Sequence, residues 1–204
     1  MQTLARLVAL LALLPVCAAG QAPAPVRSLE EFRQERVVAQ QFDLSCGAAA
    51  LATVLRYQHG EPVTEREVAI ALVSREAYLQ NPDILRARQG FSLLDMHRYV
   101  ERLGYDGAAL GGVAWDDLLR LAPAIVPLRL RGYNHFVVFR GAIGDNVLLA
   151  DPAYGTRSLT RPRFLAAWIE YRDLGHVAFT VQRRDGLVPP NRLAVTARDF
   201  PLLR

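Results

Sequence analysis

The hydrophobic pattern of the chain changes character near residue 122. Upstream of this point, apolar residues recur at steps of three and four, which is the spacing of a helix. Residues 46–57 (CGAAALATVLRY) are apolar on nearly every side, which predicts a helix in the middle of the domain. We expect this helix to end at His59, with Gly60 as its left-handed cap.

Two further helix starts show the spacing of a capping box. Thr64 is followed three residues later by Glu67, and Ser92 is followed in the same way by Asp95. The helix that begins after Ser92 is expected to end at Gly104. A fourth, shorter helix is expected over residues 115–121.

Downstream of residue 122, short runs rich in Val, Ile, Leu and Phe are separated by Gly, Asn, Asp and Pro, and they predict β-strands. The expected strands are residues 124–130, 135–139, 147–150 and 177–181. Helices followed by strands indicate an α+β domain, in which the N-terminal helices pack on a C-terminal antiparallel sheet. Residues after Gln182 are irregular, and we expect them to lie over the surface as a tail.

The first twenty residues have the plan of a secretory signal peptide: a short charged start, an apolar core and a small-residue cleavage site. We therefore predict a signal peptide at 1–20, a linker and lead-in at 21–36, one catalytic domain at 37–182 and a tail at 183–204. A lipid anchor at Cys17 is the alternative, which Pro15 and Val16 disfavour. No later stretch reaches the roughly 20 apolar residues that a membrane-spanning helix needs.

The composition of the chain argues against several classes of binding and catalytic site. All 24 basic residues are Arg, they face 20 acidic residues, and the net charge is +4. Because the arginines are scattered, the sequence disfavours a nucleic-acid-binding protein. The absence of Lys excludes a P-loop lysine and a Schiff-base lysine. Two cysteines and four histidines are too few for a Cys-rich zinc site or a disulfide framework.

Cys46 is the only cysteine beyond the predicted signal peptide. It stands where a polar segment enters the apolar helix, and either Ser45 or Asp43 is expected to cap that helix. The positive end of the helix dipole favours the thiolate, which is the nucleophilic form. Gly47 is expected to leave room for a substrate. The alternative interpretation is a small, buried, inert cysteine.

His135 is the candidate base for this thiol. Its strand leads into a hairpin which, folded about residues 143 and 144, places His135 nearly opposite Asp151. Asp151 would then orient the imidazole as the third member of a Cys-His-Asp triad. The alternative is a surface His–Asp pair, and a slip of one residue would separate the two side chains. His176 is a reserve base, whereas His59 and His97 are expected to be exposed.

Acyl transfer from a thiolate builds an oxyanion that needs two hydrogen-bond donors. The backbone N–H of Cys46 is one candidate donor. The side-chain amide of Gln40, in the segment before the helix, is the other, and Gln41 competes for this role.

Three blocks of the sequence together resemble the active-site blocks of the C39 peptidases, the papain-like bacteriocin-processing endopeptidases. They are residues 40–52 (QQFDLSCGAAALA), residues 134–138 (NHFVV) and residues 151–152 (DP). The resemblance spans roughly residues 37–168. It implies Cys46 as nucleophile, His135 as general base and acid, Asp151 as orienter and Gln40 as oxyanion donor, with no metal or organic cofactor.

Familiar members of that family are N-terminal domains of ABC exporters that cleave leader peptides after a double glycine. This chain carries Ser45 where those exporters typically have Asp, and it has its own export signal. It is similar to the stand-alone periplasmic members, including the Fap-type peptidase of functional-amyloid systems. We therefore expect a periplasmic cysteine endopeptidase that acts on a secreted or fibril-associated protein or on an export component. A catalytically idle peptide-binding domain and a papain-like cell-wall amidase are the alternatives.

Overall fold

The computed structural model describes residues 28–200, apart from residues 75, 82, 88–89 and 131. The predicted signal peptide, residues 21–27 of the predicted linker and the last four residues of the predicted tail lie outside this part of the chain. The helices are α1 Leu29–Gln34, α2 Cys46–Val54, the π-helical turn Leu55–His59, α3 Glu65–Val73, α4 Glu76–Gln80, α5 Asp83–Ala87, α6 Leu93–Arg102, α7 Trp115–Leu121, α8 Arg161–Ala167 and the 3₁₀ turn Ala197–Asp199. The strands are β1 Tyr105–Leu110, β2 Ala124–Leu130, β3 Tyr133–Ile143, β4 Asn146–Asp151, β5 Gly155–Thr160, β6 Glu170–Tyr171, β7 Gly175–His176 and β8 Ala178–Arg183.

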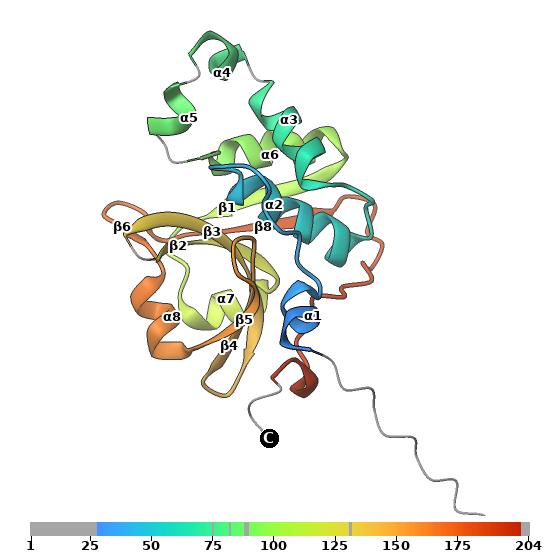
Figure 1. Ribbon diagram of the computed structural model, residues 1–204, viewed down its shortest axis with the longest axis vertical. Helices are drawn as coiled ribbons and strands as arrows, with labels where there is room; N and C mark the ends of the chain where they lie inside the picture. The colour runs from blue at the N-terminus through green and yellow to red at the C-terminus, as the bar shows by residue number, and fades with distance from the viewer. Residues whose placement is uncertain (1–27, 75, 82, 88–89, 131, 201–204) are drawn as a thin grey trace, which may run out of the picture.

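Six of these strands form one antiparallel sheet in the order β1-β8-β2-β3-β4-β5, and β6 and β7 form a separate two-stranded hairpin. In Figure 1, helices α2, α3 and α6 lie above the sheet, and α7 and α8 lie below it. The predicted α+β class, with N-terminal helices on an antiparallel sheet, is confirmed.

The alternation of side chains along the central strands divides the core in two. Ile125 and Val138 point to the first core, which they share with α2, α3 and α6. Their chain neighbours Val126 and Val137 point to the second core, which contains Phe164 of α8. Since successive strand residues face opposite sides of a sheet, strands covered on both faces become continuous apolar runs. This is why residues 124–130 and 135–139 have no polar alternation.

The helices that were predicted from local signals form, whereas α1, α4, α5 and α8 were not predicted. Both capping boxes form, at Thr64 and at Ser92. Gly60 follows the π-helical turn with a φ of 83°, in the left-handed region that favours glycine. Every residue of α2 is buried, as its uniformly apolar sequence predicts.

The hairpin formed by β3 and β4 differs from the predicted one. Its turn lies at Gly144 and Asp145, and the register shifts between Phe139 and Gly141. Beyond this bulge, Val138 pairs with Ala150, which places Asp151 diagonally from His135 instead of directly opposite. A displacement of two residues keeps both side chains on the same face of the sheet, so their proximity survives the error in register.

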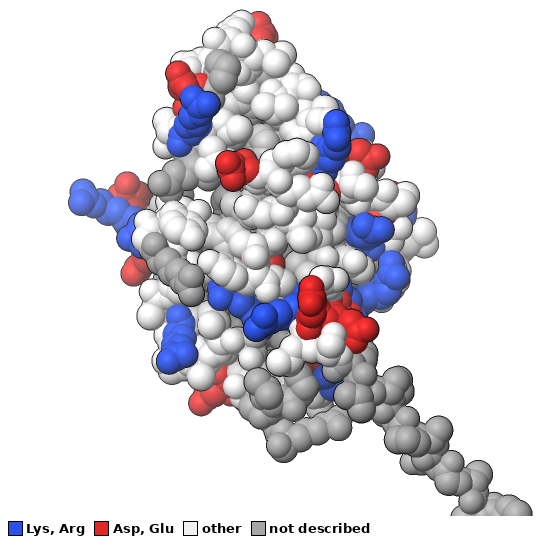
Figure 2. Space-filling model, viewed as in Figure 1, with Lys and Arg blue, Asp and Glu red and all other residues white. Residues whose placement is uncertain are grey.

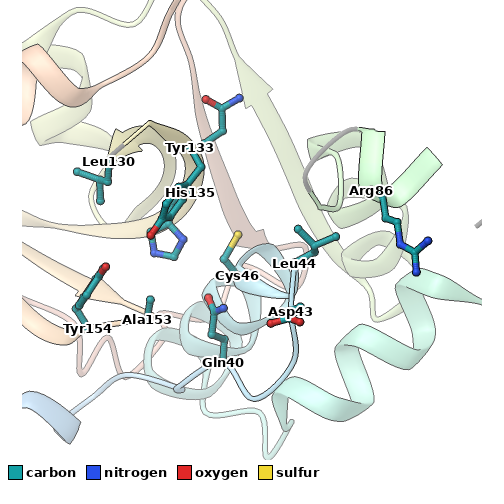
Figure 3. A pocket seen from close by; sticks show the side chains of 11 residues that line it. Gln40, Asp43, Leu44, Cys46, Arg86, Leu130, Tyr133, His135, Ala153 and Tyr154 are labelled. Atoms are coloured by element: carbon teal, nitrogen blue, oxygen red, sulfur yellow. The ribbon is translucent and has the colours of Figure 1, made fainter. Parts of the chain in front are cut away.

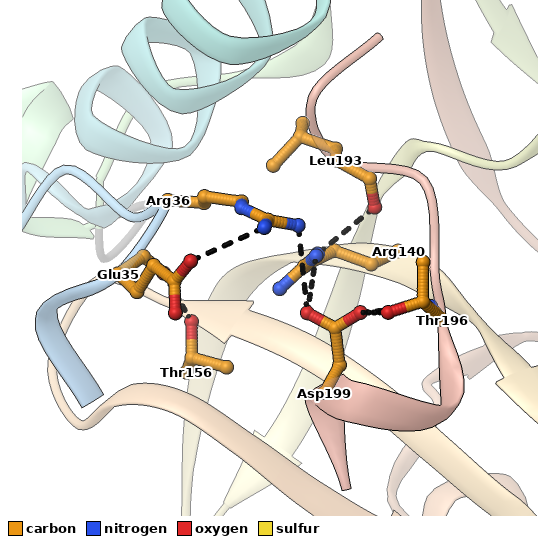
Figure 4. A network of polar contacts seen from close by, with 7 residues as sticks. All are labelled: Glu35, Arg36, Arg140, Thr156, Leu193, Thr196 and Asp199. Atoms are coloured by element: carbon orange, nitrogen blue, oxygen red, sulfur yellow. Dashed lines mark hydrogen bonds and ion pairs between the residues drawn. The ribbon is translucent and has the colours of Figure 1, made fainter. Parts of the chain in front are cut away.

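The C-terminal segment is more than the surface tail that the sequence predicts. Leu193 is fully buried in the first core. The buried guanidinium of Arg140 donates to the Leu193 carbonyl oxygen at 3.0 Å and lies 3.1 Å from the Asp199 carboxylate. Arg36 also approaches Asp199, at 3.5 Å (Figure 4). Asp199 of the tail thus contacts both Arg36, in the segment before α2, and the buried Arg140 of β3.

On the face shown in Figure 2, arginines and carboxylates are interspersed around a largely uncharged centre. Within the described residues, no helix is both long and apolar enough to cross a membrane.

Candidate active site

A cavity of about 570 Å³ lies between the N-terminus of α2 and the ends of β3 and β4 (Figure 3). Its lining consists of Gln40, Asp43, Leu44, Cys46, Arg86, Leu130, Tyr133, Asn134, His135, Ala153 and Tyr154. Three of the four sequence-predicted site residues therefore face one space. The fourth, Asp151, is completely buried behind His135.

Cys46 is the first residue of α2, and its side chain is only 5% exposed. The first N–H groups of a helix have no acceptor inside that helix, so the Cys46 N–H remains available to a ligand. The prediction that Gly47 leaves room for a substrate is wrong. A methyl group there would lie 2.6 Å from Met96 Cε and 3.4 Å from Phe136 Cδ2, so Gly47 makes room for the protein core and not for a substrate.

The start of α2 is held by a residue that the sequence analysis did not assign. Ser45 occupies the N-cap position, but neither it nor Asp43 caps the helix with its side chain, contrary to expectation. Instead, the Ser45 hydroxyl donates to Glu65 Oε1 at 2.5 Å, and the Gln41 N–H donates to the same oxygen at 3.2 Å. Glu65 is buried at the start of α3. Its carboxylate thus fixes the loop that leads to Cys46.

His135 and Asp151 form a buried pair. His135 Nε2 lies 2.7 Å from Asp151 Oδ1, which also accepts from the N–H groups of Ala153 at 2.9 Å and Tyr154 at 3.3 Å. The second carboxylate oxygen lies 2.9 Å from Arg157 Nη2 on β5. Hydrogen bonds to Oδ1 and the charge of Arg157 beside Oδ2 together hold the carboxylate in one orientation. Arg157 had no local sequence signal, because its position depends on the pairing of β4 with β5.

The electrostatics of this pair favour a charged imidazole. Burial by itself lowers the pKa of His135, but hydrogen bonding and electrostatic attraction, first to Asp151 and then to Cys46, outweigh it. The net effect raises the pKa of His135 from 6.5 to about 9. An imidazolium at neutral pH therefore lies between the Asp151 carboxylate and the sulfur of Cys46.

Gln40 lines the cavity next to Cys46, and its side-chain amide points into the space beside the sulfur (Figure 3). Its backbone N–H donates to the Pro152 carbonyl oxygen at 2.9 Å, which ties the loop before α2 to the loop after β4. Gln41 is exposed and does not line the cavity. The structure thus places Gln40, and not its neighbour, next to the thiol.

The other three histidines lie away from this cavity. His59 is buried, contrary to expectation, with Nε2 at 3.1 Å from the Val181 carbonyl oxygen, and burial lowers its pKa. His97 is partly exposed and contacts the Gly107 carbonyl oxygen, while His176 stacks on Trp168. Within the described part of the chain, no cluster of His, Cys, Asp and Glu side chains is arranged to hold a metal ion.

The sequence matches known proteins over most of its length. The sequence model of the peptidase C39 family covers residues 34–172. Two curated relatives are each named "Probable functional amyloid protease FapD". The one from Pseudomonas aeruginosa is 39% identical over 145 residues, and the one from Pseudomonas fluorescens is 40% identical over 144 residues. Each match covers 70% of this chain but only 61% of the relative, so the chain spans about three fifths of their length.

Solved structures share the fold at low sequence identity. A double glycine motif protease from an AMS/PCAT transporter, crystallised with its leader peptide, superposes with a TM-score of 0.57 at 22% identity. That match covers 72% of this chain and 90% of the transporter domain. The peptidase domain of Streptococcus ComA gives a TM-score of 0.56 at 18% identity, over 72% of this chain and 98% of the domain. With the family match and the two curated relatives, these findings show that the chain belongs to the peptidase C39 family.

Proposed function

We propose that this protein is a cysteine endopeptidase. Cys46 is the nucleophile, His135 the general base and acid, Asp151 the orienting carboxylate and Gln40 the oxyanion donor. The observation that supports it most strongly is the position of His135. One of its ring nitrogens lies 2.7 Å from a fully buried carboxylate, and the imidazole lines the same cavity as Cys46, which stands at the start of a buried helix.

In the first half of the reaction, the Cys46 thiolate attacks the carbonyl carbon of the scissile peptide bond. The charge on the carbonyl oxygen is received by the Cys46 N–H and the Gln40 amide. The His135 imidazolium gives its proton to the leaving amine, the C–N bond breaks, and a thioester remains on Cys46.

In the second half, neutral His135 takes a proton from water as the water oxygen attacks the thioester. Breakdown of this intermediate releases the carboxylic acid product and restores the thiolate and the imidazolium. Asp151 keeps His135 oriented in both halves of the reaction, which is the role of the third member in triads of this kind.

For the substrate, we propose a secreted or fibril-associated protein, or a component of its export machinery, cleaved in the periplasm. Two observations support this. The curated relatives are named functional amyloid proteases. In addition, residues 1–20 have the plan of a secretory signal peptide. Fractionation of cells that express the full chain tests the location: we expect a periplasmic product lacking the leader, and retention of the uncleaved chain in the cytoplasm would contradict this.

The catalytic proposal is tested with Cys46→Ala and with Gln41→Ala as the matched control from the same loop. We expect wild-type protein and the control to be labelled by an iodoacetamide probe and to hydrolyse peptides, and Cys46→Ala to do neither while unfolding at an unchanged temperature. Hydrolysis that persists in Cys46→Ala would refute the proposal. Labelling without hydrolysis would indicate a peptide-binding domain, and digestion of purified cell wall in place of proteins would indicate an amidase.

A further inference from the structure

A second cavity, of about 240 Å³, lies on the other side of His135. Besides His135, its walls include apolar and aromatic side chains: Phe91, Leu93, Pro127, Phe136 and Tyr171. The cavity volume is several times the roughly 30 Å³ that one water molecule occupies in the liquid, so it has room for a large side chain.

This second cavity adjoins the candidate active site. His135 and Asn134 line both cavities. Phe136 and Phe91 also lie beside Gly47, because a methyl group there would be 3.4 Å from Phe136 Cδ2 and 3.7 Å from Phe91 Cβ. The walls of the second cavity therefore begin one residue from the proposed nucleophile.

The two cavities differ in charge. The first is lined by Asp43 and Arg86, whereas His135 is the only titrating side chain besides the Tyr171 phenol in the second. A charged ligand group would lose its hydration in the second cavity without gaining a counter-ion other than the proposed catalytic base. An apolar group, in contrast, would be stabilised there by removal from water.

The walls are held in place by the fold. Phe91 is buried, and Leu93 and Phe136 pack against the first core. Pro127 is buried within β2, and its carbonyl oxygen accepts from the Ile169 N–H at 3.1 Å, next to the β6–β7 hairpin. Tyr171 of that hairpin is 39% exposed and forms the outermost wall. The cavity is therefore preformed, as binding pockets commonly are.

We propose that the second cavity is a substrate subsite that binds one large apolar side chain, of Leu to Phe size, one or two residues from the scissile bond. The distance follows from the extended peptide, which advances about 3.3 Å per residue, and from His135, the proposed catalytic base, which lines both cavities. This inference rests on the proposed peptidase function, and it adds to it a preference that a double-glycine cleavage site would not satisfy.

The test uses synthetic peptides of mixed sequence, with cleavage sites identified by mass spectrometry. We expect the wild-type protein to cleave where a large apolar residue occupies one fixed position next to the scissile bond. Leu93→Trp fills the cavity and should reduce kcat/KM for such peptides about tenfold or more, as one apolar side chain commonly does, and should reduce kcat/KM much less for peptides with Gly at that position. Leu94→Trp is the matched control, because Leu94 is 51% exposed on the same helical turn and does not line the cavity.

A second pair of variants covers the possibility that Leu93→Trp does not fold. Tyr171→Ala opens the wall and should weaken the same preference, whereas Leu174→Ala, which alters an exposed residue of the same hairpin, should not. Three outcomes would overturn the subsite alone. The wild-type protein could cleave without any apolar preference, or it could prefer glycine at the two residues next to the scissile bond. Leu93→Trp and Tyr171→Ala could also reduce the cleavage of all peptides equally. Failure of the wild-type protein to cleave any peptide would overturn the proposed function together with the subsite.

Discussion

Replacing Asp151 by Asn removes one charge from the proposed triad with little change in shape. The wild-type carboxylate is completely buried and lies 2.7 Å from His135 Nε2. An Asn oxygen in the place of Oδ1 can still accept from His135 and from the N–H groups of Ala153 and Tyr154. The other side of the group loses its charge pairing with Arg157. The substitution therefore tests the charge of Asp151 separately from its geometry.

The expected size of the effect of Asp151→Asn follows from the pKa of His135. Burial alone would lower this pKa, and Asp151 is the foremost of the groups that raise it to about 9. If Asp151 supplied the whole rise from 6.5 to about 9, its removal would cost the imidazolium about 3 kcal/mol, roughly a 300-fold change in its protonation equilibrium. Cys46 shares the rise, whereas burial opposes it and must be outweighed as well. We expect the pKa of His135 in Asp151→Asn to fall by about 1–2 units.

The sign of the pH dependence is then fixed. The pKa of His135 lies above 6.5 in the folded chain, so protonation of His135 stabilises the folded state. This stabilisation is complete below pH 6.5 and is lost as the pH rises through about 9. Activity should accordingly decline on the alkaline side near pH 9 in the wild-type protein, and at lower pH in Asp151→Asn.

The assay measures both peptide hydrolysis and the alkylation rate of Cys46 by iodoacetamide as functions of pH. Alkylation needs no knowledge of the substrate. Asp173→Asn, on the exposed loop between β6 and β7, is the matched control and should leave both profiles unchanged. If Asp151→Asn loses activity at the same alkaline pH as the wild-type protein and hydrolyses peptides at the same rate, Asp151 does not set the charge state of His135 and the reasoning is wrong.

Three other substitutions test the surroundings of the site. Gln40→Ala should lower kcat by about 10²- to 10³-fold, as loss of one oxyanion donor does, with Cys46 alkylation unchanged; an equal effect of Gln41→Ala would contradict this assignment. Glu65→Ala should lower the free energy of unfolding in urea by about 1–3 kcal/mol, because two donors lose their buried acceptor, whereas Glu65→Gln should retain most of it. Asp199→Asn should cost about 3–5 kcal/mol by leaving a buried arginine without its counter-ion, and an unchanged urea midpoint would show that this pair contributes nothing.

The elements that could be predicted are those whose signal is local. The capping boxes at Thr64 and Ser92 and the left-handed Gly60 each depend on a few neighbouring residues, and all three form. Strands β1 and β5 were not predicted, because YDGAAL and GTRSLT lack the β-branched and aromatic runs of the central strands. Both lie at the edges of the sheet, where pairing with one neighbour supplies the order that propensity does not.

For the candidate site, residue type was a better guide than geometry. Cys46 and His135 could be singled out because few residues of their kind exist in the chain. The bulge near Gly141 was invisible in the sequence, and Asp151 is close to His135 although the predicted pairing was wrong. Glu65 could not be assigned from the sequence, because its partners lie twenty or more residues upstream. Contacts of this range depend on how α2 and α3 pack, which no short pattern encodes.

The two halves of the candidate site come from the two halves of the chain, so its geometry depends on the bonds that cross between them. The N–H of Gln40 donates to the carbonyl oxygen of Pro152, directly after Asp151. The hydroxyl of Thr156, on the strand that carries Arg157, donates to the carbonyl oxygen of Glu35 at 2.7 Å. The segment before α2 is thereby aligned with the β4–β5 connection over its whole approach to the cavity. An error of 1 Å in this alignment would displace the oxyanion donor relative to the base, and misplacements of that size can cost about a hundredfold in rate. The lead-in before α2 therefore belongs to the machinery of the site as much as the helix that it precedes.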